Sequence, residues 1–232
     1  MKNIFQNKRF SFPYEYKFPG QASTERILYV TRENRLLLIL RQLFVLVSAI
    51  VIFLIGLFLN YLIGEFLAIT PGFSLILFFF VMAVAFFTIG WWWVVSLWQK
   101  SIAIVTTQRL IKFIYTTPAS RYSLALPLDM IVDTGAFTRG FIQTFLKLST
   151  FVARSSATSS GVATDDPSRV NKKYFYIENV KQAEDLQHYV SKLLLATRDA
   201  SKDMQTFRPF LPELKGESRA SFIAEHFPQF WS

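Results

Sequence analysis

Two uncharged apolar stretches, close together in the sequence, decide the architecture of this 232-residue chain. Residues 42–63 read QLFVLVSAIVIFLIGLFLNYLI, and residues 73–98 read FSLILFFFVMAVAFFTIGWWWVVSLW. At a rise of about 1.5 Å per residue they would form helices about 33 and 39 Å long, enough for a hydrocarbon core about 30 Å thick. Core helices of soluble proteins are usually shorter and apolar on one face only. The two stretches therefore predict a transmembrane hairpin over residues 42–98.

Basic residues predict how this hairpin is oriented. Residues 1–41 hold eight Lys or Arg side chains, whereas residues 64–72, which join the two spans, hold none. Because basic residues favour the cytoplasmic side, we expect a multi-pass protein with both termini in the cytoplasm. Four of the five tryptophans lie within residues 91–98, near the cytoplasmic end of the second span. This position agrees with the orientation, since indole rings favour the headgroup region.

The composition excludes several classes of function. Charged residues make up 18% of the chain, against about a quarter in soluble domains, so neither a disordered protein nor an ordinary soluble enzyme is expected. The chain has no cysteine, which excludes disulfides, thiolate metal ligands and a cysteine nucleophile. It contains no glycine-rich phosphate loop, no G-x-S-x-G and no H-E-x-x-H. We therefore expect no catalytic residue, no cofactor and no metal site.

Residues 99–197 predict a mainly β domain on the cytoplasmic side. Short β-rich runs broken by turn residues are typical of strands, and residues 122–128 also alternate with period two. We predict strands at 101–106, 110–116, 122–128, 130–137, 149–156 and 173–178, a helical turn at 139–147 and a surface loop at 157–171. Apolar residues spaced by three and four predict an amphipathic helix over 182–197, with Leu186, Val190 and Leu193 in the core. Together these elements predict an open barrel or sandwich closed by one helix.

Two stretches of this domain resemble a known family. Residues 104–111 read IVTTQRLI, similar to the I-x-T-x-Q-R-L-I hairpin of bacterial PH-like domains, and residues 126–131 read LPLDMI, similar to the I-P-L-x-x-I strand that follows it. Upstream, residues 19–21 (PGQ) and Glu25 resemble the segment before the membrane in the membrane-bound members. The resemblance implies a membrane α-helical hairpin in a bacterial plasma (inner) membrane, followed by a mainly β, PH-like barrel with a C-terminal capping helix.

The sequence thus predicts four regions. They are a cytoplasmic N-terminal segment (1–41), the two-helix transmembrane hairpin (42–98), the cytoplasmic PH-like domain (99–197) and an aromatic, proline-containing tail (198–232). Aromatic residues alternate within residues 10–18, as in an edge strand or an interfacial contact. The tail is expected either to dock onto a partner or to fold onto its own domain, and its prolines argue against long helices there.

The net charge of +9 is concentrated on both sides of the predicted hairpin. Eight basic and three acidic residues give +5 in residues 1–41, and twelve basic and seven acidic residues give +5 in residues 99–197. Anionic lipid headgroups are the partner this favours, at about 1 kcal/mol per basic residue near the surface. We predict a lipid-facing basic patch of Arg109, Lys112 and Arg121. A protein partner or a homo-oligomer stays open, whereas nucleic acid is not expected because the basic residues form no dense stripe.

The favoured function is an interaction module rather than an enzyme, and the alternative is a small membrane enzyme that acts on lipid. Asp129 and Asp133 could form an acid–base pair, and Glu184, Asp185 and His188 share one face of the predicted helix. Carboxylates near strand ends are more often turn residues. A single histidine on a polar helix face is more often solvated than bound to a metal. We therefore predict a protein that binds rather than one that catalyses.

Overall fold

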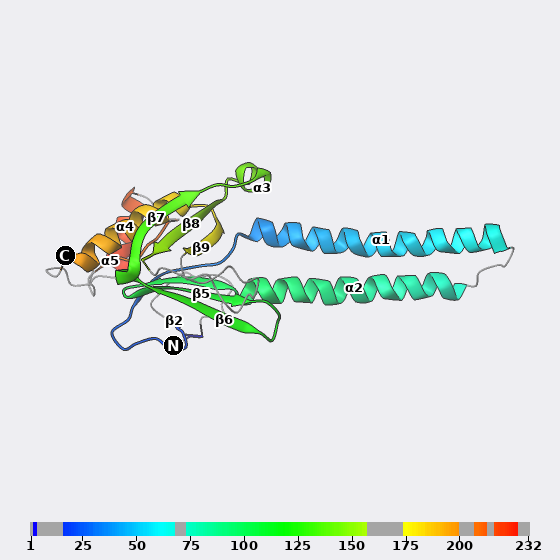
Figure 1. Ribbon diagram of the computed structural model, residues 1–232, viewed down its shortest axis with the longest axis horizontal. Coiled ribbons are helices and arrows are strands. Elements are labelled where there is room, and N and C mark those ends of the chain that lie inside the picture. Colours follow the sequence, from blue (N-terminus) through cyan, green and yellow to red (C-terminus); the bar gives the residue numbers. More distant parts are fainter. Residues whose placement is uncertain are drawn as a thin grey trace. The chain divides into compact units, whose positions relative to one another are not determined.

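The computed structural model describes residues 2–3, 16–67, 73–156, 174–199, 207–212 and 216–226. The chain divides into two compact units (Figure 1). The helical unit comprises residues 35–98, and the β-rich unit comprises residues up to 34 together with residues from 99 onward. The β-rich unit therefore draws on both sides of the apolar region, and the segment that the sequence sets apart as 1–41 contributes to it.

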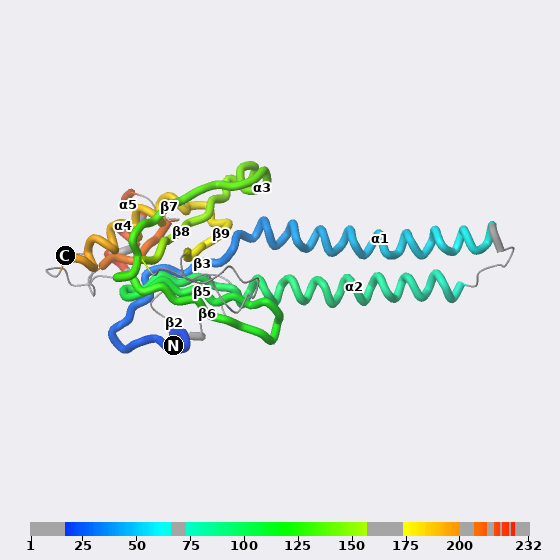
Figure 2. Tube along the Cα trace, viewed as in Figure 1, coloured from blue at the N-terminus to red at the C-terminus, as the bar shows by residue number. Residues whose placement is uncertain are grey.

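A four-stranded antiparallel sheet forms the first half of the β-rich unit. Its order is β3-β4-β5-β6, with bounds Ile27–Thr31, Ile102–Thr106, Arg109–Tyr115 and Arg121–Pro127. The last three confirm the strands predicted at these positions. The first, β3, was not predicted; it pairs with β4, from Ile27 opposite Thr106 to Thr31 opposite Ala103. Figure 2 follows the chain through this sheet.

A three-stranded antiparallel sheet forms the second half. It consists of β7, β8 and β9, with bounds Ile131–Phe137, Ser149–Ser155 and Tyr174–Val180, and follows the short 3-10 helix Leu128–Met130. These strands were also predicted, and the predicted helical turn is α3 (Phe141–Phe145) in the β7–β8 connection. The predicted loop at 157–171 lies outside the described residues. Among the described strands no pairing joins the two sheets, so the β-rich unit is not a closed barrel there.

The helix α4 (Ala183–Arg198) packs against β7 and β8 and confirms the predicted amphipathic helix. Leu186, Val190 and Leu193 are all at most 1% exposed. They lie in the same core as Leu110 of the first sheet and Phe151 of the second. The helix α4 therefore packs into a core that both sheets share. Burial of each such side chain stabilises the fold by about 1.5–3 kcal/mol.

The described part of the tail folds onto this unit. Phe210 is 6% exposed and packs its ring 4.9 Å from that of Tyr29 and 5.0 Å from that of Tyr189. Its backbone amide donates to the carbonyl of Leu28. A helix, α5 (Gly216–His226), follows. It lies between Pro212 and Pro228 rather than across either, and so avoids the clash that proline causes inside a helix.

At the N-terminus, the two-residue strands β1 (Lys2–Asn3) and β2 (Tyr16–Lys17) pair in parallel. Phe18, the last residue of the predicted aromatic row, is buried and lies 6.4 Å from the ring of Phe113. Residues 10–15 of that row lie outside the described residues.

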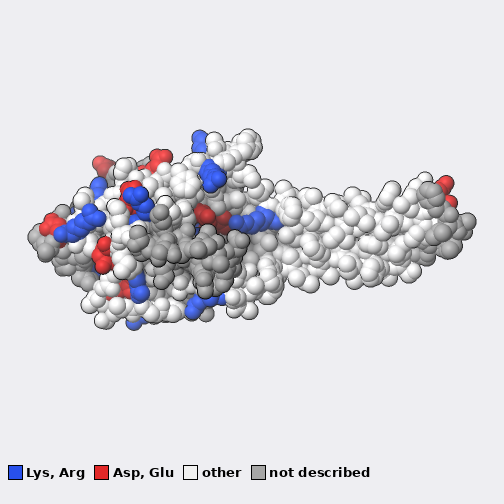
Figure 3. Space-filling view, in the orientation of Figure 1, with Lys and Arg blue, Asp and Glu red and all other residues white. Residues whose placement is uncertain are grey.

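The helical unit consists of α1 (Arg35–Leu67) and α2 (Phe73–Lys100). Both helices are long and apolar enough to cross a membrane. Many of their large apolar side chains are exposed, for example Phe44 at 74% and Phe73 at 76%, unlike those of a soluble core helix. Figure 3 shows no acidic or basic atoms along the middle of these helices. The predicted spans are confirmed at this level of length and composition.

Glycines bring the two helices close together. A Cβ atom on Gly90 would lie 2.9 Å from Cγ1 of Val45, and one on Gly56 would overlap the ring of Phe79. Small residues at such positions let helix backbones approach each other, which favours association in an apolar medium. The helices therefore pack as an antiparallel hairpin.

Candidate functional site

The chain leaves the four-stranded sheet toward α1 and returns to it from α2 at the same end of the strands. β3 runs toward α1, and β4 starts just after α2 ends. Because the two strands are antiparallel neighbours, Thr31 at the end of β3 lies opposite Ala103 near the start of β4. We call this end of the β-rich unit the junction edge.

Hydrogen bonds fix the residues next to both helices at the junction edge. The backbone amide of Asn34 donates to the carbonyl of Asn179 at the end of β9. Nζ of Lys100 donates to the carbonyl of Pro118, in the turn between β5 and β6, at 2.8 Å. The residues that connect the helices to the β-rich unit are therefore bonded to parts of both sheets.

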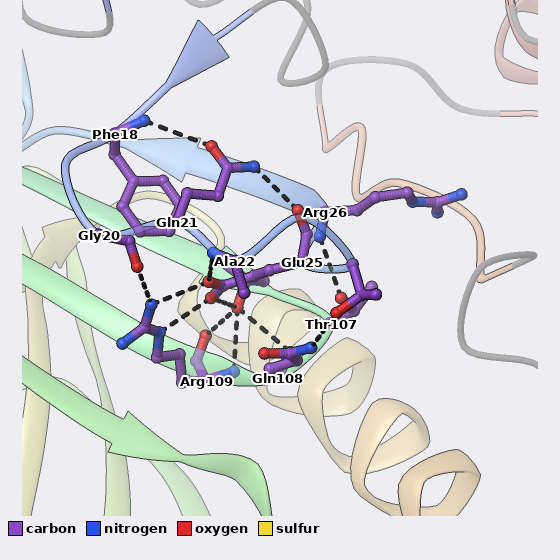
Figure 4. Close-up of polar contacts among 11 residues, drawn as sticks. Phe18, Gly20, Gln21, Ala22, Glu25, Arg26, Thr107, Gln108 and Arg109 are labelled. Atoms are coloured by element: carbon purple, nitrogen blue, oxygen red, sulfur yellow. Dashed lines mark hydrogen bonds and ion pairs between the residues drawn. The ribbon is translucent and has the colours of Figure 1, made fainter.

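Figure 4 shows an ion pair between Glu25 and Arg109. The register places it at the opposite end of the four-stranded sheet, where Ile27 pairs with Thr106 and Arg109 with Pro127. Nε of Arg109 donates to Oε1 of Glu25 at 3.0 Å, and Nη2 donates to Oε2 at 2.9 Å. The hydroxyl of Thr106 donates to Oε1 at 2.8 Å, and the backbone amide of Ala22 donates to Oε2 at 3.2 Å. The side chain of Glu25 is fully buried, whereas that of Arg109 is 31% exposed.

These contacts set the protonation of the pair. Burial raises the pKa of the Glu25 carboxyl, but the hydrogen bonds from Arg109, Thr106 and the Ala22 amide lower it by more, so the pKa lies below its usual range. The hydrogen bond to Glu25 raises the already high pKa of Arg109. Both groups are therefore charged at neutral pH.

The geometry limits what Glu25 can do chemically. Glu25 accepts hydrogen bonds from the Ala22 amide and from two donors of Arg109, and it shares the single hydroxyl proton of Thr106 with the carbonyl of Arg109. Both carboxylate oxygens are therefore engaged by internal donors. We call these four residues the clasp, because they join the segment before α1 to the β4–β5 hairpin that follows α2.

Further bonds surround the clasp and strengthen the same connection. Nη2 of Arg109 donates to the carbonyl of Gly20 at 2.6 Å, and Gly20 has φ +81°, which favours glycine. The backbone amide of Arg26 donates to the hydroxyl of Thr107, and the backbone amide of Thr107 donates to the carbonyl of Arg26. Nε2 of Gln108 donates to the hydroxyl of Thr24 at 3.0 Å. Figure 4 shows Gly20 and Arg26 of one segment beside residues 107–109 of the other.

The structure does not bring the three predicted lipid-facing residues together. Arg109 is opposite Pro127 and Arg121 opposite Tyr115, at the two ends of the β5–β6 ladder. At about 3.4 Å per residue those ends are about 20 Å apart. Arg109 belongs to the clasp, whereas exposed Arg121 lies at the junction edge, 5.6 Å from the ring of Phe113.

Lys112 lies between them on β5, and its Nζ contacts Oε2 of Glu178 on β9 at 3.4 Å. The role of Arg109, Lys112 and Arg121 toward lipid stays a prediction. The three residues lie at different points along the β5–β6 ladder, and Arg121 is the one at the junction edge.

The residues considered for an enzyme are exposed. Asp133 on β7 lies 3.9 Å from Arg154, and Asp129 belongs to the 3-10 helix. Glu184, Asp185 and His188 project from the outer face of α4. Within the part of the chain that the structure describes, no three His, Asp or Glu side chains are placed to hold a metal ion.

Sequence reasoning identified both halves of the clasp without predicting their contact. Residues 19–21, Glu25 and residues 104–111 are the segments that carry the family resemblance. One signal was present: Glu25 lies two residues before the start of the apolar run of residues 27–30, where a buried, uncompensated charge would be costly. Comparisons with models of protein families, with curated proteins and with solved structures found no match for this chain.

Proposed function

We propose that this protein is a PH-like interaction module held by two membrane spans at the cytoplasmic face of a bacterial plasma membrane. In this proposal it binds anionic lipid headgroups or a protein partner, or it self-associates. One observation carries the proposal: β3 before the helices and β4 after them are neighbours in one sheet. A domain built from both ends of a helical hairpin must stay beside the bilayer that the hairpin enters.

Three further features support this function. The eight basic residues in 1–41 and the absence of any in 64–72 favour cytoplasmic termini. The clasp fixes the segment before α1 to the β4–β5 hairpin after α2, so both chain ends of the helical pair belong to one folded domain. Two antiparallel sheets with one amphipathic helix in their common core are compatible with a PH-like arrangement.

Single-cysteine labelling tests the topology, and the natural chain offers a cysteine-free background. Glu65 lies near the end of α1, and Leu195 is 65% exposed on α4. In intact cells, Glu65→Cys should react with a membrane-impermeant maleimide, and Leu195→Cys should react only after permeabilisation. The reverse pattern would place the β-rich unit outside the cell and contradict the proposal.

Hydrogen exchange of the full chain in nanodiscs tests the partner. The full chain is needed, because a fragment of residues 101–197 would lack β3 and Glu25. Engagement of lipid predicts slower exchange in the turn at residues 116–120 and around Arg121 in anionic discs than in neutral discs, with a difference that falls as salt rises. Equal exchange in both lipids would remove lipid from the proposal and leave a protein partner or a second copy.

A further inference from the structure

The short helix α3 exposes three large apolar side chains. Phe141 is 83% exposed, Phe145 is 75% exposed and Ile142 is 47% exposed. The two phenyl rings stack with centroids 6.0 Å apart and planes 15° apart. We call these three residues the aromatic tip. Contiguous exposed apolar side chains of this kind are candidates for a binding surface.

Local bonds hold the aromatic tip in its exposed position. Gly140, with φ +89°, begins the helix, and its carbonyl accepts a hydrogen bond from the hydroxyl of Thr144. The amide of Arg139 donates to Oε1 of Gln143 at 2.8 Å. After the helix, the amide of the fully buried Leu148 donates to the carbonyl of Gln143 at 2.8 Å. The rings are therefore exposed on a fixed support.

The aromatic tip is connected to the residues that lead into α1. Nε2 of Gln143, within α3, donates to Oδ1 of Asn179 at 2.8 Å. Nδ2 of Asn179 donates to Oε1 of Glu33 at 2.7 Å, and its carbonyl accepts from the amide of Asn34. Because α1 begins at Arg35, α3 belongs to the junction edge.

The charged residues that neighbour the aromatic tip in the sequence are of one sign. Arg139 and Lys147 flank α3 and are both exposed. No acidic residue occurs anywhere in residues 138–148. Apolar rings with basic residues beside them are the combination that lies in the interface of an anionic bilayer, the rings at the acyl boundary and the cations among the headgroups.

We propose that the aromatic tip inserts into the interface of the bilayer that α1 enters, with Arg139 and Lys147 against anionic headgroups. This inference rests on the proposed membrane anchoring and adds a third attachment point to the two helices. It commits to a lipid surface, because the tip is tied to the start of α1 and its flanking charges complement anionic headgroups.

A fluorescent label tests the insertion. Phe141→Cys in the full chain carries an environment-sensitive NBD group in anionic nanodiscs that hold one copy each, which excludes coverage by a second copy. Leu195→Cys is the matched control, an exposed apolar position on α4. Iodide in the water should quench the label at 141 several-fold less than at 195, and lipids with shallow spin labels should quench it more.

Equal iodide quenching at 141 and 195 in single-copy discs would overturn the inference. So would protection that occurs only in discs with two copies, which would assign the tip to self-association. Replacing both Arg139 and Lys147 by Ser should raise iodide quenching at 141, and no increase would refute the headgroup contact. Maleimide labelling at Glu65→Cys separates the two proposals, since it reports the orientation of the hairpin whatever the tip does.

Discussion

The two ends of the β-rich unit use charged and apolar side chains in opposite ways. At the clasp, the carboxylate of Glu25 is fully buried and the guanidinium of Arg109 is occupied by it. At the junction edge, Arg139 and Lys147 are exposed beside the exposed rings of α3. The position of a basic residue in the fold, rather than the net charge, decides whether an internal partner engages it. Under the proposed function, exposed basic residues such as Arg139 and Lys147 are the ones that lipid would meet.

The largest effect should come from breaking the clasp. Glu25→Gln removes the charge that compensates Arg109, and we expect the free energy of unfolding to fall by about 2–3 kcal/mol. Glu178→Gln is the matched control in an exposed ion pair and should cost about 0.5 kcal/mol or less. Thermal unfolding of the full chain in one detergent measures both. If both variants lost the same free energy of unfolding, the buried Glu25 pair would stabilise the fold no more than the exposed Glu178 pair.

A smaller loss should follow from changing the shape of the cation. Arg109→Lys keeps the charge but cannot form both bonds to Glu25 or the bond to the Gly20 carbonyl. We expect about 1–2 kcal/mol of destabilisation in the same unfolding experiment. Lys112→Arg is the control in the reverse direction and should change stability little. If Arg109→Lys left the free energy of unfolding unchanged, the charge alone would account for the stability of the clasp.

Acid should weaken the clasp in a way that identifies Glu25. The pKa of this carboxyl is lower in the folded chain than in the unfolded chain, so the unfolded state binds its proton first. The stability it contributes is complete above its ordinary pKa and is lost as the pH falls through the lowered value. The difference in melting temperature between the natural chain and Glu25→Gln should therefore shrink below about pH 4.5. A constant difference would contradict the lowered pKa.

The smallest effect on folding is expected at the junction edge. Replacing Phe141 and Phe145 by Ser should change the free energy of unfolding by about 0.5 kcal/mol or less, because both rings are exposed. Phe151→Ser is the control at a fully buried ring and should cost several kcal/mol. Melting temperatures in the same detergent compare them. A large loss in the double variant would show that the rings pack against the protein.

Local patterns were enough to predict most of the elements. The strands from residue 102 to 137 and the helix α4 lie within one or two residues of their predicted bounds, because alternation and helical spacing are local signals. β3 lacked such support, since its partner β4 lies beyond both long helices. The clasp was missed for the same reason: 84 residues separate Glu25 from Arg109, and only the register of β3 against β4 brings them together.

Exposure was the other property that the sequence could not supply. Phe141 and Phe151 are the same residue type ten positions apart, yet one is 83% exposed and the other is fully buried. The difference lies in the fold: Phe151, on β8, shares a core with buried residues of α4, whereas Phe141, on α3, lies outside that core. The same reasoning applies to the basic residues, whose internal partners were not predictable from charge counts.

The position of β3 has a consequence for biosynthesis. A ribosome makes Glu25 and β3 first, and 81 further residues must follow before Thr106 is present to contact Glu25. At about 5–20 residues per second this takes on the order of 4–16 s, during which both helices are synthesised. Under the proposed function, the sheet becomes complete only in chains whose hairpin has returned to the cytoplasm. Under that function, a chain that inserted only its first helix would keep β3 unpaired and the charge of Glu25 uncompensated.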